Sequence, residues 1–234
     1  METAPPVIKI QDAVFTWDGA SAFRLTLPDL TILRGERIAL VGPSGSGKTT
    51  LINLLAGVTV PGSGQVEILG QDLTALSAGR RDRFRADHIG LIFQLFNLLA
   101  YGSVAENVAL ALAFSPKRRK AVAEPEAEIR RLITALGLDA SLADQPATAL
   151  SVGQQQRVAA ARALIGAPEI VLADEPTSAL DPANRDAFLD LLFAETARTG
   201  ATVIAVTHDP TVAERFDRVI ALETVAKASR GVAA

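Results

Sequence analysis

The chain has 234 residues, 23 Lys and Arg against 26 Asp and Glu, and no cysteine, so its formal net charge is −3. At roughly 100–200 residues per domain, this length permits one large or two small domains with a self-sufficient core. The near-neutral charge argues against a dedicated nucleic-acid-binding protein, and the lack of cysteine excludes disulfides, iron–sulfur clusters and thiolate zinc sites. Residues 1–6 show no secretory signal, and no uncharged stretch reaches the roughly 20 apolar residues of a membrane-spanning helix, so we expect a cytosolic chain.

The first part of the chain predicts β structure that leads into a strand, a loop and a helix. Val7–Phe15 and Phe23–Leu33 are rich in β-branched and aromatic residues and flank the turn signal Asp18-Gly19, which predicts an antiparallel pair. Residues 38–41 are a short apolar run, a glycine-rich loop follows, and residues 49–56 show helical spacing that ends at Gly57.

The rest of the chain alternates short apolar runs with helical patterns, as expected for a buried parallel sheet. The predicted strands are residues 66–69, 89–93, 170–173, 202–206 and 219–222, and the predicted helices are residues 126–136, 154–165 and 182–199. Residues 95–150 lack strand signals, so we expect a helical subdomain inserted into the α/β core.

Two further segments, a basic run and the C-terminal tail, are not expected to contribute to the hydrophobic core. The basic run Lys117–Lys120 predicts a solvated loop or helix start, with contact to anionic lipid headgroups or an acidic partner as the alternative. The small and polar residues after Glu223 are expected to fray.

Residues 42–49, Gly-Pro-Ser-Gly-Ser-Gly-Lys-Thr, match the phosphate-binding loop G-x-x-x-x-G-K-[ST] between a predicted strand and a predicted helix. Gly45 and Gly47 allow backbone N–H groups to turn toward phosphates, and the helix N-terminus adds partial positive charge. Lys48 would reach the β- and γ-phosphates, and Thr49 would offer a hydroxyl to Mg²⁺. The alternative, a glycine-rich turn that happens to contain lysine, leaves this agreement of motif and context unexplained.

A pair of carboxylates, Asp174-Glu175, follows the predicted strand at residues 170–173. Asp174 would hold Mg²⁺ through water, and Glu175 would orient or deprotonate the attacking water. Taken alone, the pair would equally suit a structural cap of a loop.

Residues 150–157, Leu-Ser-Val-Gly-Gln-Gln-Gln-Arg, provide a second anion site at the start of a predicted helix. Ser151 is expected to cap this helix, and its hydroxyl and the Gly153 N–H would bind the anion. Two phosphate-binding features in one chain imply that two copies share nucleotide. At these residues the sequence resembles the ATP-binding subunits of ABC (ATP-binding cassette) transporters, whose signature motif is Leu-Ser-Gly-Gly-Gln. The resemblance runs from Trp17 to about Leu222.

The resemblance implies an α/β fold with a P-loop NTPase core, a mixed and largely parallel sheet, an N-terminal antiparallel β subdomain and an inserted α-helical subdomain. Residues 1–234 would form a single ABC ATPase domain. Within it, residues 1–94 and 168–222 would form the catalytic core with the β subdomain, residues 95–167 the helical subdomain that ends in the signature helix, and residues 223–234 a tail.

The resemblance also implies roles for individual residues. Trp17 would stack on adenine, with Phe15 as the rival that alternation assigns to the core, and His88 matches no family element and is expected to be structural. The expected catalytic residues are Glu175, His208 and Gln94, and the expected Mg²⁺ ligands are Thr49, Gln94 and Asp174. The expected ATP-binding residues are Trp17, Gly42, Pro43, Ser44, Gly45, Ser46, Gly47, Lys48, Thr49, Thr50, Ser151, Gly153, Gln154 and Asp181, of which Ser151 and Gly153 would act on ATP held by the second copy.

Some residues depart from the family pattern or point to different branches of the family. Val152 stands where the signature has glycine, which predicts a weaker or differently tuned ATP-driven dimer. Residues 93–108 look like cassettes of the lipoprotein-release, macrolide-efflux and cell-division group, whereas Ser178–Asp181 is more typical of amino-acid importers.

The implied function is that of an ATP-hydrolysing subunit that uses Mg²⁺, pairs head to tail with a second copy and drives a separate transmembrane permease from the cytoplasmic face of the inner membrane. A groove at residues 95–104 would receive a short helix of the permease, and no nucleic-acid partner is expected. One alternative is an ABC-type ATPase that regulates or mechanically drives a cell-envelope complex without solute transport. Soluble ABC proteins of DNA repair or translation usually carry two cassettes or a long coiled-coil insertion, and a P-loop kinase or GTPase is disfavoured by residues 150–154 and by His208.

Overall fold

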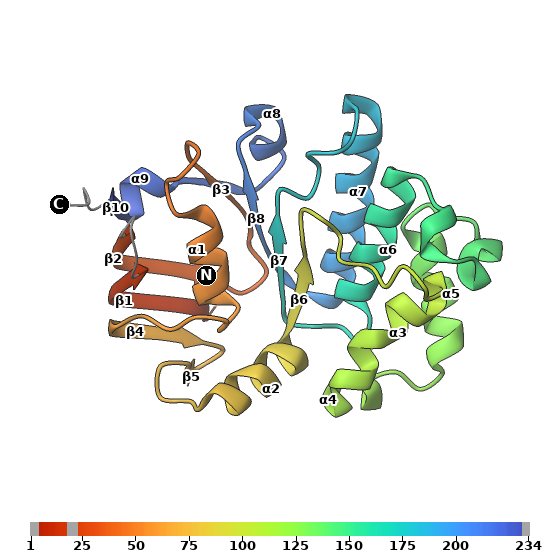
Figure 1. Ribbon diagram of the computed structural model, residues 1–234, viewed down its shortest axis with the longest axis horizontal. Coiled ribbons are helices and arrows are strands. Elements are labelled where there is room, and N and C mark those ends of the chain that lie inside the picture. Colours follow the sequence, from red (N-terminus) through yellow and green to blue (C-terminus); the bar gives the residue numbers. More distant parts are fainter. Residues whose placement is uncertain (1–4, 18–22, 231–234) are drawn as a thin grey trace. The chain divides into compact units, whose positions relative to one another are not determined.

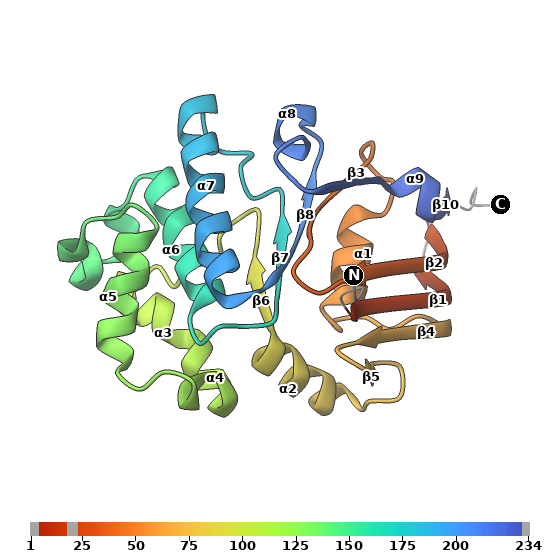
Figure 2. The same ribbon diagram turned by 180° about the vertical axis from the view of Figure 1, so that it is seen from behind.

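The computed structural model describes residues 5–17 and 23–230, and the turn predicted at Asp18-Gly19 lies outside these residues. The chain divides into two compact units, one formed by residues 1–82 and 204–234 and the other by residues 83–203. Figures 1 and 2 show the ribbon from opposite sides.

The first unit holds an antiparallel sheet with the strand order β10-β2-β1-β4-β5. Its strands are β1 (Pro6–Trp17), β2 (Phe23–Leu33), β4 (Ser63–Ile68), β5 (Gln71–Asp72) and β10 (Lys227–Arg230). The β-branched and aromatic side chains that predicted the first two strands alternate into the core, as Ile8, Ile10 and Phe15 do on β1. The predicted antiparallel pair is confirmed, with Trp17 opposite Phe23 at its end.

A second group of strands in this unit positions the phosphate-binding loop. β3 (Arg37–Val41) pairs in parallel with β9 (Arg218–Ala221), and β8 (Thr202–Thr207) lies on the other side of β3. Ile38, Ala39 and Leu40 of β3 are buried, and α1 (Lys48–Leu55) begins after the loop that follows. The unit also contains the short helices α8 (Pro210–Ala213) and α9 (Leu222–Val225).

The second unit combines two parallel strands with a set of helices. β6 (Ile89–Ile92) pairs with β7 (Ile170–Asp174), so both strands end at the same edge. Its helices are α3 (Val104–Phe114), α4 (Pro116–Lys120), α5 (Pro125–Ala135), the 3₁₀ turns η1 (Ala140–Asp144) and η2 (Ala147–Ala149), α6 (Val152–Leu164) and α7 (Pro182–Thr199), and α2 (Ala78–His88) enters it.

Small side chains bring α6 close to β6. Residues 159–161 and Ala163 of α6 are buried, and a Cβ on Gly90 would lie 2.3 Å from the Ala163 carbonyl oxygen. Glycine is therefore needed on β6 where the helix backbone approaches, and this contact fixes the helix that begins at Ser151.

Two sequence predictions need correction. The tail does not fray between residues 223 and 230, because α9 runs to Val225 and β10 pairs with β2. The basic run forms a helix start as predicted, but Arg118 is buried rather than solvated: it donates hydrogen bonds of 2.8 and 2.7 Å to the carbonyls of Ile165 and Ala163. It thereby satisfies carbonyl groups at the end of α6 that lack helical partners.

Candidate nucleotide-binding site

The phosphate-binding loop lies between β3 and α1, where the sequence places it. Gly45 and Gly47 have φ angles of 80° and 99°, in the region that L side chains rarely adopt. Gly47 is the N-cap of α1 and supplies no side-chain hydrogen bond, so the first backbone N–H groups of the helix remain available to an anion. The Lys48 ammonium lies over the loop and donates to the carbonyls of Gly42 at 2.7 Å and Pro43 at 3.0 Å.

Trp17 lies at the end of β1, beside the same helix start. Its Nε1 donates a hydrogen bond of 3.4 Å to the Thr50 hydroxyl, and its ring meets Phe15 edge to face with 5.0 Å between centroids. Phe15 is 7% exposed and Trp17 is 46% exposed. The interpretation of Phe15 as a core residue is confirmed, and Trp17 presents an aromatic surface that a base can stack on.

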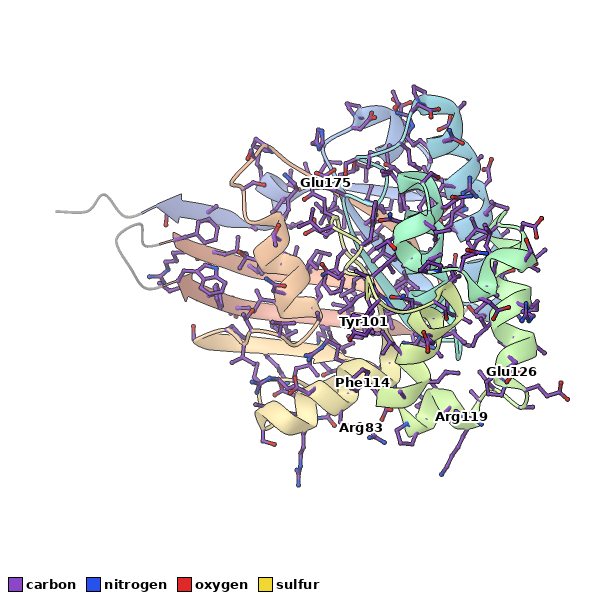
Figure 3. All side chains as sticks on the ribbon, turned by 45° about the vertical axis from the view of Figure 1, so that its right-hand side comes forward. Arg83, Tyr101, Phe114, Arg119, Glu126 and Glu175 are labelled. Atoms are coloured by element: carbon purple, nitrogen blue, oxygen red, sulfur yellow. The ribbon has the colours of Figure 1, made fainter. Side chains whose placement is uncertain are left out.

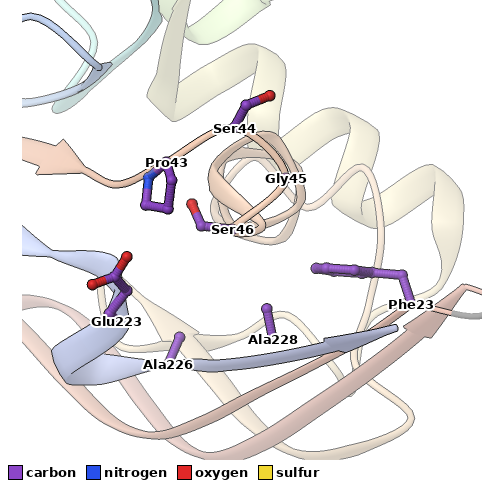
Figure 4. Close-up of a pocket in the computed structure, with 8 residues that line it drawn as sticks. All are labelled: Phe23, Pro43, Ser44, Gly45, Ser46, Glu223, Ala226 and Ala228. Carbon is purple, nitrogen blue, oxygen red and sulfur yellow. The ribbon is translucent and has the colours of Figure 1, made fainter. Parts of the chain in front are cut away.

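A hollow of about 400 Å³ borders the other side of the loop. Figure 4 shows residues 43–46 above it, the Phe23 ring at one end and the Glu223 carboxylate facing the loop from below. Ala226 and Ala228 complete the floor. Sequence analysis missed Phe23 and Glu223. Glu223 reaches the loop because β9 pairs in parallel with β3, with Ala221 opposite Val41, and Phe23 reaches it from the start of β2.

Gln94, Asp174 and Glu175 share one edge of the second unit. Ile92 is opposite Ala173 in the parallel ladder, so all three residues follow or end strands at the carboxyl edge, where ligands bind in open α/β sheets. Glu175 has a φ of 48°, which is uncommon for a residue other than glycine, and its carbonyl accepts hydrogen bonds from the N–H and hydroxyl of Ser178. A strained backbone conformation of this kind persists only where the surrounding structure holds it, and such residues cluster at functional sites.

The signature residues form the N-terminus of α6. The Ser151 hydroxyl accepts from the Gln154 N–H, and the Gln154 side chain accepts from the Ser151 N–H, so the two residues form a capping box. The predicted N-cap role of Ser151 is thereby confirmed. Val152 is the first residue of the helix and is 50% exposed.

Asp181 lies next to these residues as the N-cap of α7, with Pro182 as the first helical residue, as predicted. Hydrogen bonds from the Asn184 side chain and N–H lower the pKa of the Asp181 carboxyl. A hollow of about 290 Å³ is lined by Ser151, Val152, Gly153, Gln154, Arg157, Ala179, Leu180, Asp181 and Asn184. The structure thus brings the predicted signature residues and Asp181 together.

His208 directly follows β8 in the first unit and is exposed. His88 lies at the end of α2, stacks on Phe84 and has Nδ1 3.2 Å from Glu169 Oε2. Lys117 Nζ lies 3.1 Å from the same ring nitrogen. These contacts agree with the structural role expected for His88.

Comparison with known proteins identifies the class. Residues 25–178 match the family described as ABC transporter. The chain is 44% identical over 198 residues to the uncharacterised ABC transporter ATP-binding protein YbbA of Escherichia coli, covering 85% of each chain. It is 42% identical over 195 residues to the lipoprotein-releasing system ATP-binding protein LolD of Chromohalobacter salexigens, covering 83% of this chain and 81% of that one.

Further comparisons extend the likeness to a longer protein and to a solved structure. The macrolide export ATP-binding/permease protein MacB of Marinobacter nauticus is 41% identical over 214 residues, which are 89% of this chain but 32% of that one. The dimeric structure of the ATP-binding cassette MJ0796 in a post-hydrolysis state, bound to ADP and Pi, matches with a TM-score of 0.80 and 35% identity over 92% of this chain and 93% of that chain.

These matches define an ATP-binding cassette with the α/β fold of ABC ATPases. The chain belongs to the ABC transporter family, and it is an ATP-binding and ATP-hydrolysing cassette. None of the helices within residues 5–17 and 23–230 is long and apolar enough to cross a membrane.

Proposed function

We propose that this chain is the ATPase subunit of a transporter, and that two copies close head to tail on ATP to drive a separate transmembrane permease. One observation carries the proposal: the chain presents two helix starts suited to phosphate, at Gly47 and at Ser151. In the proposed dimer, Ser151 and Gly153 of one copy contact ATP held by the phosphate-binding loop of the other. The solved dimer of a related cassette bound to ADP and Pi supports this arrangement.

In this proposal, the residues of the loop bind the nucleotide before any chemistry occurs. The backbone N–H groups of Gly42 and of residues 44–50 surround the phosphates, Lys48 turns from its carbonyl acceptors to the β- and γ-phosphates, and Trp17 stacks on adenine. Glu175 orients and deprotonates the attacking water, Gln94 and His208 contact the water and the γ-phosphate, and Asp181 supports the site from its helix cap. Catalysis of this kind depends on positioning and electrostatic stabilisation.

Mg²⁺ fits the donor groups that the chain offers. Thr49 presents an exposed hydroxyl in the first turn of α1, Asp174 ends β7 with a carboxylate, and Gln94 provides an amide oxygen. Mg²⁺ prefers oxygen ligands and is commonly held by one or two protein groups together with phosphates and water. The ion would neutralise charge on the phosphates.

The surface around residues 95–104 is the proposed docking site of the permease. Leu95 and Tyr101 are 83% and 87% exposed, so they offer apolar and aromatic surface to a partner helix. The buried Asn107 holds this loop, because its side chain accepts from the Leu99 N–H and donates to the carbonyls of Leu99 and Ser103. Such docking would place the chain at the cytoplasmic face of the inner membrane.

The proposal is tested by affinity purification of tagged Glu175→Gln protein with ATP from detergent-solubilised membranes of the native host, followed by mass spectrometry. A stoichiometric integral membrane protein is expected to accompany the tagged chain. In a separate assay, the purified unmodified chain should hydrolyse ATP in the presence of Mg²⁺, and the Lys48→Ala variant should not. Recovery of soluble protein alone, as an ATP-bound dimer, contradicts the permease assignment. A membrane partner with large outer domains and no solute path favours a cassette that drives an envelope complex.

A further inference from the structure

The outer face of α4 is basic and carries one protruding aromatic side chain. Phe114, the last residue of α3, is 70% exposed. Arg83, Lys117, Arg119 and Lys120 are also exposed, and Figure 3 labels Arg83, Phe114 and Arg119 on the lower part of the molecule. We call these five residues the α4 surface.

Hydrogen bonds within the second unit bring α2 to this surface. The Ser115 hydroxyl, next to Phe114, donates to Asp87 Oδ1, and Arg83 Nε donates to Asp87 Oδ2 at 2.8 Å. Asp87 therefore joins the guanidinium of α2 to the junction between α3 and α4. Arg83 is thus held beside Phe114, and Lys117, Arg119 and Lys120 follow Phe114 on the next helix.

Arg118 fixes the direction of the short helix. Its guanidinium is buried against the carbonyls at the end of α6, whereas Lys117, Arg119 and Lys120 on either side of it remain exposed. A helix of this length has little stability of its own. Anchoring by Arg118 therefore holds the neighbouring cations outward in a fixed place.

The patch keeps a positive charge after its internal pairing. Asp87 and Glu169 have side chains that are 16% and 27% exposed, and they pair with Arg83 and Lys117. Arg119 and Lys120 form no ion pair with any residue that the structure describes. A chain with a net charge of −3 thus displays a local cationic surface around an exposed phenyl ring.

We propose that the α4 surface rests on the anionic phospholipid headgroups of the membrane that holds the permease, which presupposes the membrane location proposed above. Lys and Arg near an anionic bilayer are attracted by its surface potential, and an aromatic ring partitions into the interface. Long side chains follow the headgroups while their stems stay against the protein. Phe114 is 70% exposed and projects outward, which suits a yielding bilayer surface.

Vesicle binding tests this proposal with the full chain. Sedimentation would compare vesicles of phosphatidylcholine alone with vesicles of equal parts phosphatidylcholine and phosphatidylglycerol. The expected result is binding to the anionic vesicles that weakens as salt is added, since salt screens exposed charges. Each basic residue near the surface raises binding about five-fold, so Arg119→Gln with Lys120→Gln should weaken it about 25-fold. Phe114→Ala should weaken it several-fold further.

A matched pair of substitutions serves as control. Arg24→Gln with Lys227→Gln makes the same change in net charge on exposed residues of β2 and β10 in the first unit. Equal loss of binding in this variant, or no preference for anionic vesicles in the unmodified chain, overturns the proposal. If the double variant Arg119→Gln with Lys120→Gln binds vesicles as the unmodified chain does but no longer co-purifies with an acidic protein, the lipid proposal is overturned in favour of a protein partner. ATPase activity in solution should be unchanged in all these variants. If the unmodified chain has no ATPase activity, the proposed function is refuted, whatever the vesicle experiment shows.

Discussion

The indole Nε1 of Trp17 lies 3.4 Å from the Thr50 hydroxyl and donates a hydrogen bond to it. The contact joins the end of β1 to the first turn of α1, so the ring is held beside the helix start that the phosphate-binding loop leads into. An aromatic residue there can stack on a base while the helix binds phosphate, which agrees with the role proposed for Trp17.

Trp17→Ala is expected to weaken ATP binding by about 5- to 150-fold, since base–aromatic stacking contributes about 1–3 kcal/mol. Trp17→Phe keeps an aromatic face and loses only the hydrogen bond to Thr50, so it should bind within a few-fold of the unmodified chain. Calorimetric titration with ATP measures both. Unaltered affinity in Trp17→Ala would show that adenine stacks elsewhere.

Glu175→Gln should lower ATP turnover by about 10²- to 10⁴-fold, because the amide cannot accept the proton of the attacking water. ATP binding should persist, since the substitution keeps the size of the side chain at a residue with a φ of 48°. The bound ATP should then hold two copies together. Phosphate release and light scattering in the presence of ATP measure these effects, and near-normal turnover would remove Glu175 from the proposed catalytic group.

Val152→Gly should strengthen ATP-dependent dimerisation. Val152 is half exposed at the first residue of α6 and lines the hollow shared with Leu180 and Asp181, so its methyl groups occupy space beside the signature residues. Val152→Ala removes these methyl groups without adding glycine's backbone freedom, and it separates the two causes. If sedimentation shows the same ATP-dependent dimer in all three proteins, Val152 does not tune closure.

The sequence predicts the parts of this protein in which a local pattern determines local structure. The phosphate-binding loop, the cap at Ser151 and the cap at Asp181 each need only a few consecutive residues, and the structure places them where their patterns indicate. The resemblance to a known family adds the α/β fold, which the comparisons confirm.

Long-range contacts explain what sequence reasoning missed. Arg118 reads as one cation in a basic run, and its burial depends on carbonyl groups at the end of a helix 44 to 47 residues further along the chain. Glu223 reads as the start of a frayed tail, and it faces the phosphate-binding loop because β9, which ends two residues before it, pairs in parallel with β3. No local pattern contains either partner.

Tyr101→Glu should uncouple the cassette from the proposed permease while leaving ATPase activity of the isolated chain intact. The side chain is 87% exposed, so a carboxylate there has little effect on folding but opposes an apolar contact. Asn107→Ala should also weaken coupling to the permease, although the buried Asn107 side chain does not contact the partner. The substitution removes the hydrogen bonds that hold the loop at Leu99 and Ser103. Co-purification with the permease measures both effects. If Tyr101→Glu recovers as much permease as the unmodified chain, the permease docks elsewhere.

Glu169 should stabilise the second unit at neutral pH and lose this effect in acid. Burial raises the pKa of its carboxyl, but hydrogen bonds from His88 and Lys117 outweigh burial and lower the pKa to about 2 from an ordinary value of 4.5. An acid with a lowered pKa in the folded state contributes its full stability above about pH 4.5 and loses it as the pH falls toward about 2.

The comparison of unmodified protein with Glu169→Gln isolates this contribution, since both lose their other carboxylate interactions equally. At pH 7 the variant should be less stable to urea by about 1–2 kcal/mol, a value that allows for solvent screening of a partly exposed side chain. The difference should shrink as the pH is lowered in steps from about 5 to about 2, because the ordinary pKa is 4.5 and the folded-state pKa is about 2. A difference that stays constant over this range would mean that Glu169 acts through packing rather than through its charge.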